Sequence, residues 1–194
     1  MKKIFLIGAG GHCQSCIDII EQDKKFKIIG IVDPFILERK KFGYEIFNDF
    51  NLNKYFEIAK YAFITIGLTK RNDLKKRDKY FKNLKQIGFK LPIFKAKSAY
   101  VSKNSKINEG TIIHNNVFIN SGVQIGSNSI INTGTIIEHG STIGNNTHIS
   151  TGVIINGNCN IGNNSFIGSG CVIPNDVNIN DNSFKRAFKL IIKK

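Results

Sequence analysis

Isoleucine or valine occupies every sixth position of the chain from Val101 to Ile179, without interruption. A second set of residues, most of them small, stands four positions after each of these, beginning with Ser105 and Thr111. A period of six matches neither the 3.6-residue repeat of a helix nor the two-residue alternation of a sheet, and it is typical of a solenoid. We therefore predict a coil of short strands over the second half of the chain.

A longer repeat of eighteen residues lies over the shorter one. The motif Ile-Gly-x-Asn begins at Ile125, Ile143 and Ile161, and a variant of it begins at Ile179. Three hexads thus make one turn with three strands and three corners, so the coil is a triangular prism whose parallel strands stack about 4.8 Å apart. Ile fills the interior, and Asn, Gly, Asp and Ser suit corners with positive φ.

This pattern resembles the hexapeptide-repeat acyltransferases. The resemblance implies a left-handed parallel β-helix over residues 98–184, assembled as a homotrimer with active sites between subunits. It does not fix the chemistry, because zinc hydrolyases of the γ-carbonic anhydrase type and regulatory domains share the repeat. A purely structural coil is a further alternative.

Composition narrows the remaining classes of function. The net charge is +14, but 24 of the 28 basic residues are Lys and no Arg cluster or aromatic platform accompanies them, so we do not expect nucleic-acid binding. No apolar run approaches the ~20 residues of a membrane span. No signal peptide is recognisable, since Met1 and two lysines run directly into a strand pattern. We expect a soluble, cytoplasmic protein without integral membrane contact.

The four cysteines do not form a recognisable disulfide set. Cys159 and Cys171 fall in the inward register of the coil and are expected in its core. Cys13 and Cys16 form a CxxC motif, which is compatible with redox or zinc chemistry. No second ligand pair accompanies the motif, and we favour a packed helix face.

The first 95 residues predict a small Rossmann-like α/β domain. Apolar strands are expected at 3–7, 27–33 and 61–67, and helices at 13–22 and 69–86, an alternation that favours a parallel sheet. The first turn aims main-chain N–H groups and a helix N-terminus at one point, which suits an anion. Asp33 ends the second strand beside this turn, where a carboxylate accepts from a ribose hydroxyl. Cys13 replaces the third glycine of a dinucleotide fingerprint, so NAD chemistry is not favoured.

Gly8-Ala-Gly-Gly-His12, Asp33 and the C-terminal coil together resemble the sialic-acid O-acetyltransferase and bacillosamine N-acetyltransferase family. The resemblance implies that the N-terminal domain binds a nucleotide sugar and that the coil binds acetyl-CoA. The expected reaction is acetyl transfer to an amino group of the sugar in surface-glycan synthesis, with O-acetylation as the alternative. The implied substrate-binding residues are Gly8, Gly10, Gly11, His12, Asp33 and Gly67.

One corner of the coil departs from the usual corner residues. Ile137 is followed by Glu138, His139 and Gly140, and the stretch from Asn132 to His139 matches the Asn-Thr-x-x-x-Ile-Glu-His motif of the family. A corner His faces outward, and His titrates near neutrality as a general base requires. By resemblance His139 is the catalytic base and Glu138 its supporting carboxylate. Amino-acetylating members carry an acidic residue where this chain has Gly140, so a neighbouring chain is the other possible source of the carboxylate.

The same resemblance assigns acetyl-CoA binding to four residues of the coil: Asn132, His148, Gly157 and Ser169. His114 has no family role and is expected at the surface. His114, His139 and His148 are the best zinc set that the sequence offers, but their spacing matches the zinc relatives poorly, and we expect no metal. Residues 185–194 form a basic tail that either caps the last turn or contacts anionic lipid, and we favour the cap.

Overall fold

The computed structural model describes residues 1–49, 51–68 and 71–192. The N-terminal part is a five-stranded sheet with strand order β3-β4-β2-β1-β5. Its elements are β1 (Lys2–Ile7), α1 (Gly11–Gln22), β2 (Phe26–Val32), β3 (Lys40–Lys41), β4 (Tyr44–Phe47), α2 (Leu52–Ile58), β5 (Tyr61–Ile64) and α3 (Arg71–Ile87). The apolar residues of α1 cover one face of the sheet, and those of α2 and α3 cover the other.

The structure confirms the three predicted strands and both predicted helices of this part, with three differences. The hairpin of β3 and β4 and the short helix α2 were not predicted, and the antiparallel pairing of β3 with β4 makes the sheet mixed rather than parallel. Strand β5 ends at Ile64 instead of residue 67. The predicted start of the last helix, at Thr69 and Lys70, lies outside the described residues.

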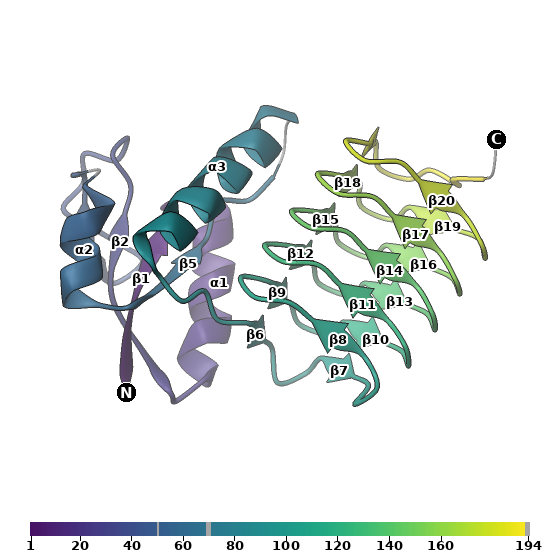
Figure 1. The fold of residues 1–194 in the computed structure, drawn as a ribbon, viewed down its shortest axis with the longest axis horizontal. Coiled ribbons are helices and arrows are strands. Elements are labelled where there is room, and N and C mark those ends of the chain that lie inside the picture. Colours follow the sequence, from purple (N-terminus) through teal and green to yellow (C-terminus); the bar gives the residue numbers. More distant parts are fainter. Residues whose placement is uncertain (50, 69–70, 193–194) are drawn as a thin grey trace.

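The remainder of the chain is a left-handed parallel β-helix, as predicted (Figure 1). Its two-residue strands are β6 (Phe94–Lys95), β7 (Tyr100–Val101), β8 (Lys106–Ile107), β9 (Ile112–Ile113), β10 (Phe118–Ile119), β11 (Gln124–Ile125), β12 (Ile130–Ile131), β13 (Ile136–Ile137), β14 (Thr142–Ile143), β15 (His148–Ile149), β16 (Ile154–Ile155), β17 (Asn160–Ile161), β18 (Phe166–Ile167), β19 (Val172–Ile173), β20 (Asn178–Ile179) and β21 (Phe184–Lys185). Each strand pairs with the strand one turn later, in register. The second residue of almost every strand is buried in one continuous apolar core.

Three sheets make the three faces of the prism. We name each sheet after one of its strands: the β9 sheet contains β6, β9, β12, β15, β18 and β21, the β10 sheet contains β7, β10, β13, β16 and β19, and the β11 sheet contains β8, β11, β14, β17 and β20. The corner after each sheet is named after one of its residues. The Asn132 corner follows the β9 sheet, the His139 corner the β10 sheet and the Asn146 corner the β11 sheet. Positive φ at these corners, for example 51° at Asn146 and 68° at Gly140, explains their preference for Asn and Gly.

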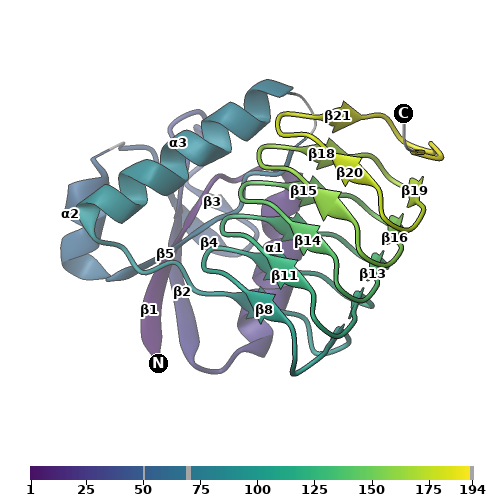
Figure 2. The same cartoon turned by 45° about the vertical axis from the view of Figure 1, so that its right-hand side comes forward.

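The N-terminal part docks on one face and one edge of the prism (Figures 1 and 2). Buried residues of α1 share a core with Ile112 and Ile130 of the β9 sheet. Helix α3 lies along the Asn146 corner, where the Asn146 side-chain amide donates to the Leu74 carbonyl over 3.0 Å. The β9 sheet is therefore covered on both sides, by the core of the coil and by α1.

The C-terminal tail packs on the last turn of the coil. Leu190 forms a parallel bridge with Val172, and the main-chain N–H of Ile191 donates to the Val172 carbonyl over 2.9 Å. Ile191 is buried in the core of the coil. These contacts, within the described residues, confirm the predicted cap. Among the described residues no helix is long and apolar enough to cross a membrane.

Ile154 and Ile155 offer a matched test of the inward register. Ile155 is fully buried in the coil, whereas its neighbour Ile154 points outward and is partly exposed. We expect Ile155→Ala to lower the free energy of unfolding by about 2–5 kcal/mol, because it leaves a cavity between stacked turns. Ile154→Ala should cost clearly less. Urea unfolding of both variants at one protein concentration measures the difference, and equal losses would contradict the assigned register.

Candidate active site

His139 projects from the surface of the coil, as predicted. Its side chain is 61% exposed, and its Nδ1 lies 3.8 Å from the Glu138 Oε2. The Asn120 side-chain amide, one turn earlier, donates to the same carboxylate oxygen over 2.5 Å. The Glu138 carboxylate is thereby fixed on one side of the imidazole, where it can orient the ring through Nδ1.

Gly157 lies against the other side of the same imidazole. A Cβ added at Gly157 would stand 2.6 Å from the His139 Nε2, closer than atoms can approach. Glycine at this position therefore leaves room for the ring. The contact with His139 is thus a second reason for a glycine that the family resemblance assigns to acetyl-CoA binding. The imidazole is held between the carboxylate of its own turn and the bare Cα of the next.

Two other predicted residues lie on a different corner. Asn132 and Ser169 belong to the Asn132 corner, where the Ser150 and Ser169 hydroxyl oxygens are 2.9 Å apart. Strand β13 separates Asn132 from His139 along the chain, so the two residues stand at opposite ends of one prism face. A single chain thus does not bring the predicted base together with these predicted cofactor residues.

His148 and His114 are buried in the β9 sheet region, under the N-terminal part. The prediction that His114 lies at the surface is wrong: its exposed fraction is 2%, because α1 covers this face of the coil. His148 is 5% exposed, and its ring packs edge-on against Phe166. Burial, with Arg77 nearby, lowers the pKa of His114 to about 4 and that of His148 to about 3, so both rings are neutral at pH 7. Among the described residues, neither ring nitrogen of His148 has a hydrogen-bond partner, although the Leu68 main chain lies close by.

The predicted nucleotide-sugar residues do come together, around the turn after β1. A Cβ on Gly67 would stand 2.9 Å from the His12 Cβ, so these two residues are in contact. Gly10 and Gly11 face open space. In the first turn of α1 the Cys13 N–H donates to the Gly10 carbonyl over 2.9 Å, whereas the N–H groups of Gly11 and His12 precede the first helical acceptor. Asp33 binds the main chain of this turn and of its own loop. Its Oδ2 accepts from the Ala9 N–H over 2.8 Å, and its Oδ1 accepts from the Phe35 N–H over 3.0 Å.

Helix α3 contributes three residues that the sequence analysis missed. Lys76 and Tyr80 line a small cavity with Gly8 and Asp33, and the same two side chains border a larger groove of about 410 Å³. Arg77 is fully buried. Its guanidinium donates to the carbonyls of Ile64 (2.8 Å), Ile66 (3.0 Å) and Asn128 (3.2 Å), which ties the chain after β5 to the coil. The uniform Lys-rich pattern of this helix gave no signal that set these residues apart.

The zinc set considered from the sequence is not assembled. His139 lies on an exposed corner at the end of the β10 sheet, whereas His114 and His148 are buried behind the β9 sheet. One subunit therefore does not bring these three histidines together.

Two family models match the chain, one in each part. Residues 3–84 match the PglD N-terminal domain, and residues 96–194 match the GMPPB C-terminal domain. The second match spans half of the chain. The chain belongs to the GMPPB C-terminal domain family through its coil. The match of the first part to the PglD N-terminal domain confirms the predicted resemblance to the hexapeptide-repeat sugar N-acetyltransferases.

Solved structures support the same fold for this chain. The acetyltransferase domain of PglB from Neisseria gonorrhoeae superposes with a TM-score of 0.89 at 22% identity, covering 99% of this chain and 92% of the other. A mutant of perosamine N-acetyltransferase from Caulobacter crescentus, in complex with CoA and GDP-perosamine, gives 0.82 at 22% identity, covering 100% and 90%. WeeI from Acinetobacter baumannii gives 0.72 at 17% identity, covering 93% and 90%. No curated protein matches the chain.

The buried histidines His114 and His148 predict that acid destabilises the folded chain. In the unfolded chain their pKa is about 6.5, so below that pH the unfolded state binds protons that folded His114 and His148 do not. The free energy of unfolding should therefore be constant above about pH 7 and fall as the pH drops from about 6.5 to about 4, by up to about 1.4 kcal/mol per pH unit for each ring. The stability that these rings give is thus present above their unfolded pKa and is lost on acidification.

Urea unfolding across this pH range measures the slope. The double variant His114→Gln with His148→Gln should reduce the slope, with a remainder due to His12, whose pKa is also lowered by burial. His139→Gln, which removes an exposed ring, should leave the slope unchanged. A double variant with the slope of the wild type would contradict the assignment to His114 and His148.

Proposed function

We propose that this protein transfers an acetyl group from acetyl-CoA to an amino group of a nucleotide-activated amino sugar. The observation that carries the proposal is the outward-facing His139, whose ring lies beside the Glu138 carboxylate and against the bare Cα of Gly157. An exposed imidazole on a rigid coil, with a carboxylate beside it, is what a general base requires. The solved structures with the same fold include PglB in complex with acetyl coenzyme A and perosamine N-acetyltransferase with CoA and GDP-perosamine.

The geometry assigns separate tasks to the two ring nitrogens of His139. Nδ1 faces the carboxylate of Glu138, which favours the tautomer with its proton on Nδ1. Nε2 lies next to Gly157 of the following turn and is the nitrogen that accepts a proton. The amine nitrogen of the sugar attacks the thioester carbonyl carbon and forms the C–N bond while its proton passes to Nε2. The C–S bond then breaks, and the imidazolium gives this proton to the departing CoA sulfur.

Acetyl-CoA binding is proposed for Asn132, His148, Gly157 and Ser169. Gly157 shares the corner of the base, whereas Asn132 and Ser169 lie at the far end of the β13 face. A homotrimer in which the His139 corner of one coil meets the Asn132 corner of its neighbour would bring Gly157 and the proposed base next to Asn132 and Ser169. For His148 the proposal rests on the family resemblance alone, since its ring is buried beside the Leu68 main chain.

The nucleotide sugar is proposed to bind at the turn after β1. The N–H groups at Gly10 and Gly11 and the start of α1 suit a diphosphate. Lys76 lines the same small cavity as Gly8 and Asp33 and adds a positive charge there. Asp33 retains acceptor capacity beyond its two main-chain contacts and is proposed to bind a ribose hydroxyl. We place the protein in the cytoplasm, where acetyl-CoA and nucleotide sugars are formed.

Removal of the His139 imidazole tests the assignment of the base. His139→Ala should lower kcat by about 10²–10⁴ with little change in the affinity for acetyl-CoA, since general-base catalysis contributes that much. Gly157→Ala should also lower kcat, because its methyl group takes the space of the Nε2 atom. Steady-state kinetics of the single variants and of the double variant separate the effects. If Gly157 acts through His139, the double variant should be no slower than His139→Ala, whereas additive losses would contradict this coupling.

Mixed oligomers test the shared site. His139→Ala and His148→Ala chains are co-expressed with different affinity tags and assayed at an acetyl-CoA concentration too low to saturate the His148→Ala variant. Each mixed trimer should have about one site in three with both histidines intact, if each site takes His139 from one subunit and His148 from its neighbour. Activity of the doubly purified mixture should therefore rise well above that of either parent. Two separately expressed preparations, combined only in the assay, are the control. Light scattering of the wild type measures the trimer, and a monomer or an inactive mixture would contradict the shared site.

A further inference from the structure

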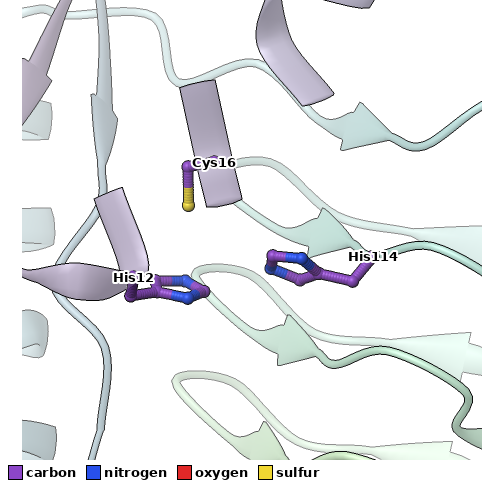
Figure 3. Close-up of side chains that lie close together, drawn as sticks. All are labelled: His12, Cys16 and His114. Atoms are coloured by element: carbon purple, nitrogen blue, oxygen red, sulfur yellow. The ribbon is translucent and has the colours of Figure 1, made fainter. Parts of the chain in front are cut away.

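A cluster of three metal-ligand side chains lies at the seam between the N-terminal part and the coil, away from the His139 corner. His12 and Cys16 come from α1, and His114 comes from the end of β9 (Figure 3). One ligand atom from each residue lies within 4.8 Å of those of the other two. His12 and Cys16 are four residues apart, so helical geometry places them one above the other on the face of α1 that meets the coil.

The cluster is largely buried. Cys16 is fully buried, His114 is 2% exposed, and His12 is partly exposed. The Nε2 atoms of His12 and His114 are buried and have no hydrogen-bond partner among the described residues. A buried polar atom without a partner costs about 1–3 kcal/mol, so two of them side by side require an explanation. The imidazole rings face each other with their centroids 5.1 Å apart (Figure 3).

We propose that His12, Cys16 and His114 form a binding site for a thiophilic divalent cation, with Zn²⁺ as the best match. Two imidazoles and one thiolate form a ligand set that zinc accepts, with a fourth position left for water or another ligand. Tetrahedral bonds of about 2.0–2.3 Å bring ligand atoms to roughly 3.3–3.8 Å from one another, so small side-chain rotations from the present positions close the site. The bound ion would tie α1 to the coil.

The protonation states of the three groups fit this ligand set. Burial and neighbouring positive charge lower the pKa of His12 and of His114, so both present neutral nitrogens at pH 7. Burial raises the pKa of the Cys16 thiol, which means that the ion must displace its proton. His148 is a further neighbour of the two histidines.

The Arg77 guanidinium is the main unfavourable charge, because it is buried close to all three residues. Its positive charge stabilises a thiolate at Cys16 but opposes the cation. Arg77 forms its hydrogen bonds to carbonyl groups, and its Nη2 has no partner among the described residues. A thiolate created by the ion would face this guanidinium and offset part of the repulsion. The affinity should accordingly lie below that of structural zinc sites that contain two or more thiolates.

Titration of the chelator-treated, full-length protein with Co²⁺ and then Zn²⁺ tests the proposal. We expect one equivalent of Co²⁺ per chain, with a thiolate-to-cobalt charge-transfer band in the near ultraviolet that Zn²⁺ abolishes by displacement. Zn²⁺ should also raise the Tm, because it binds only the folded chain. Cys16→Ser should lose the charge-transfer band, and His114→Ala should weaken binding by at least about tenfold.

Two matched variants control for unspecific effects. Cys13→Ser removes the other buried cysteine of α1, and His139→Ala removes a histidine on a distant corner, so both should bind as the wild type does. Circular dichroism and the metal-free Tm verify that each variant folds. No saturable binding at one equivalent, or an unchanged charge-transfer band in Cys16→Ser, would overturn the proposal. Since the proposed acetyl transfer uses no metal, metal binding and acetyl transfer are measured independently.

Discussion

The main-chain hydrogen bonds between successive turns of the coil are the constraint on which the rest of the structure depends. They hold residues eighteen positions apart in contact, so Gly157 must lie over His139 and Asn120 must lie beside Glu138. The same ladder keeps His139 and Asn132 at opposite ends of one face. A rigid scaffold of this kind positions the proposed base without any help from a flexible loop, and in the proposed trimer a second subunit completes the site.

Docking of the N-terminal part on the β9 sheet is the second constraint on the structure, because it decides which side chains of the coil are buried. It buries a face of the prism that would otherwise be solvated, and with it His114 and His148. Arg77 joins the two parts through carbonyls from both. The polar groups gathered at this seam are neutral histidines, a thiol and one guanidinium, an environment that stabilises uncharged ligand atoms and penalises acid conditions.

Local repetition made the coil predictable, because each hexad contains its own inward residue and corner. The outward His139 followed from the same register. The burial of His114 could not be predicted, since it depends on where another domain docks and not on the repeat. Arg77 was hidden among the lysines of α3. The approach of His114 to His12 and Cys16 joins residues about a hundred positions apart. The hairpin was missed because β3 is only two lysines and β4 only four residues, too short to show a pattern.

The central claim is that the protein transfers an acetyl group to an amino group of the sugar and not to a hydroxyl group. The most direct measurement incubates the protein with isotopically labelled acetyl-CoA and a panel of UDP-, GDP-, CMP- and dTDP-linked amino sugars, each paired with its hydroxyl counterpart, and identifies the product by NMR spectroscopy. The account predicts one amino sugar converted to an amide with stoichiometric release of CoA, and no reaction of its hydroxyl counterpart. An ester formed on the hydroxyl sugar, with the amino sugar unreacted, would contradict it.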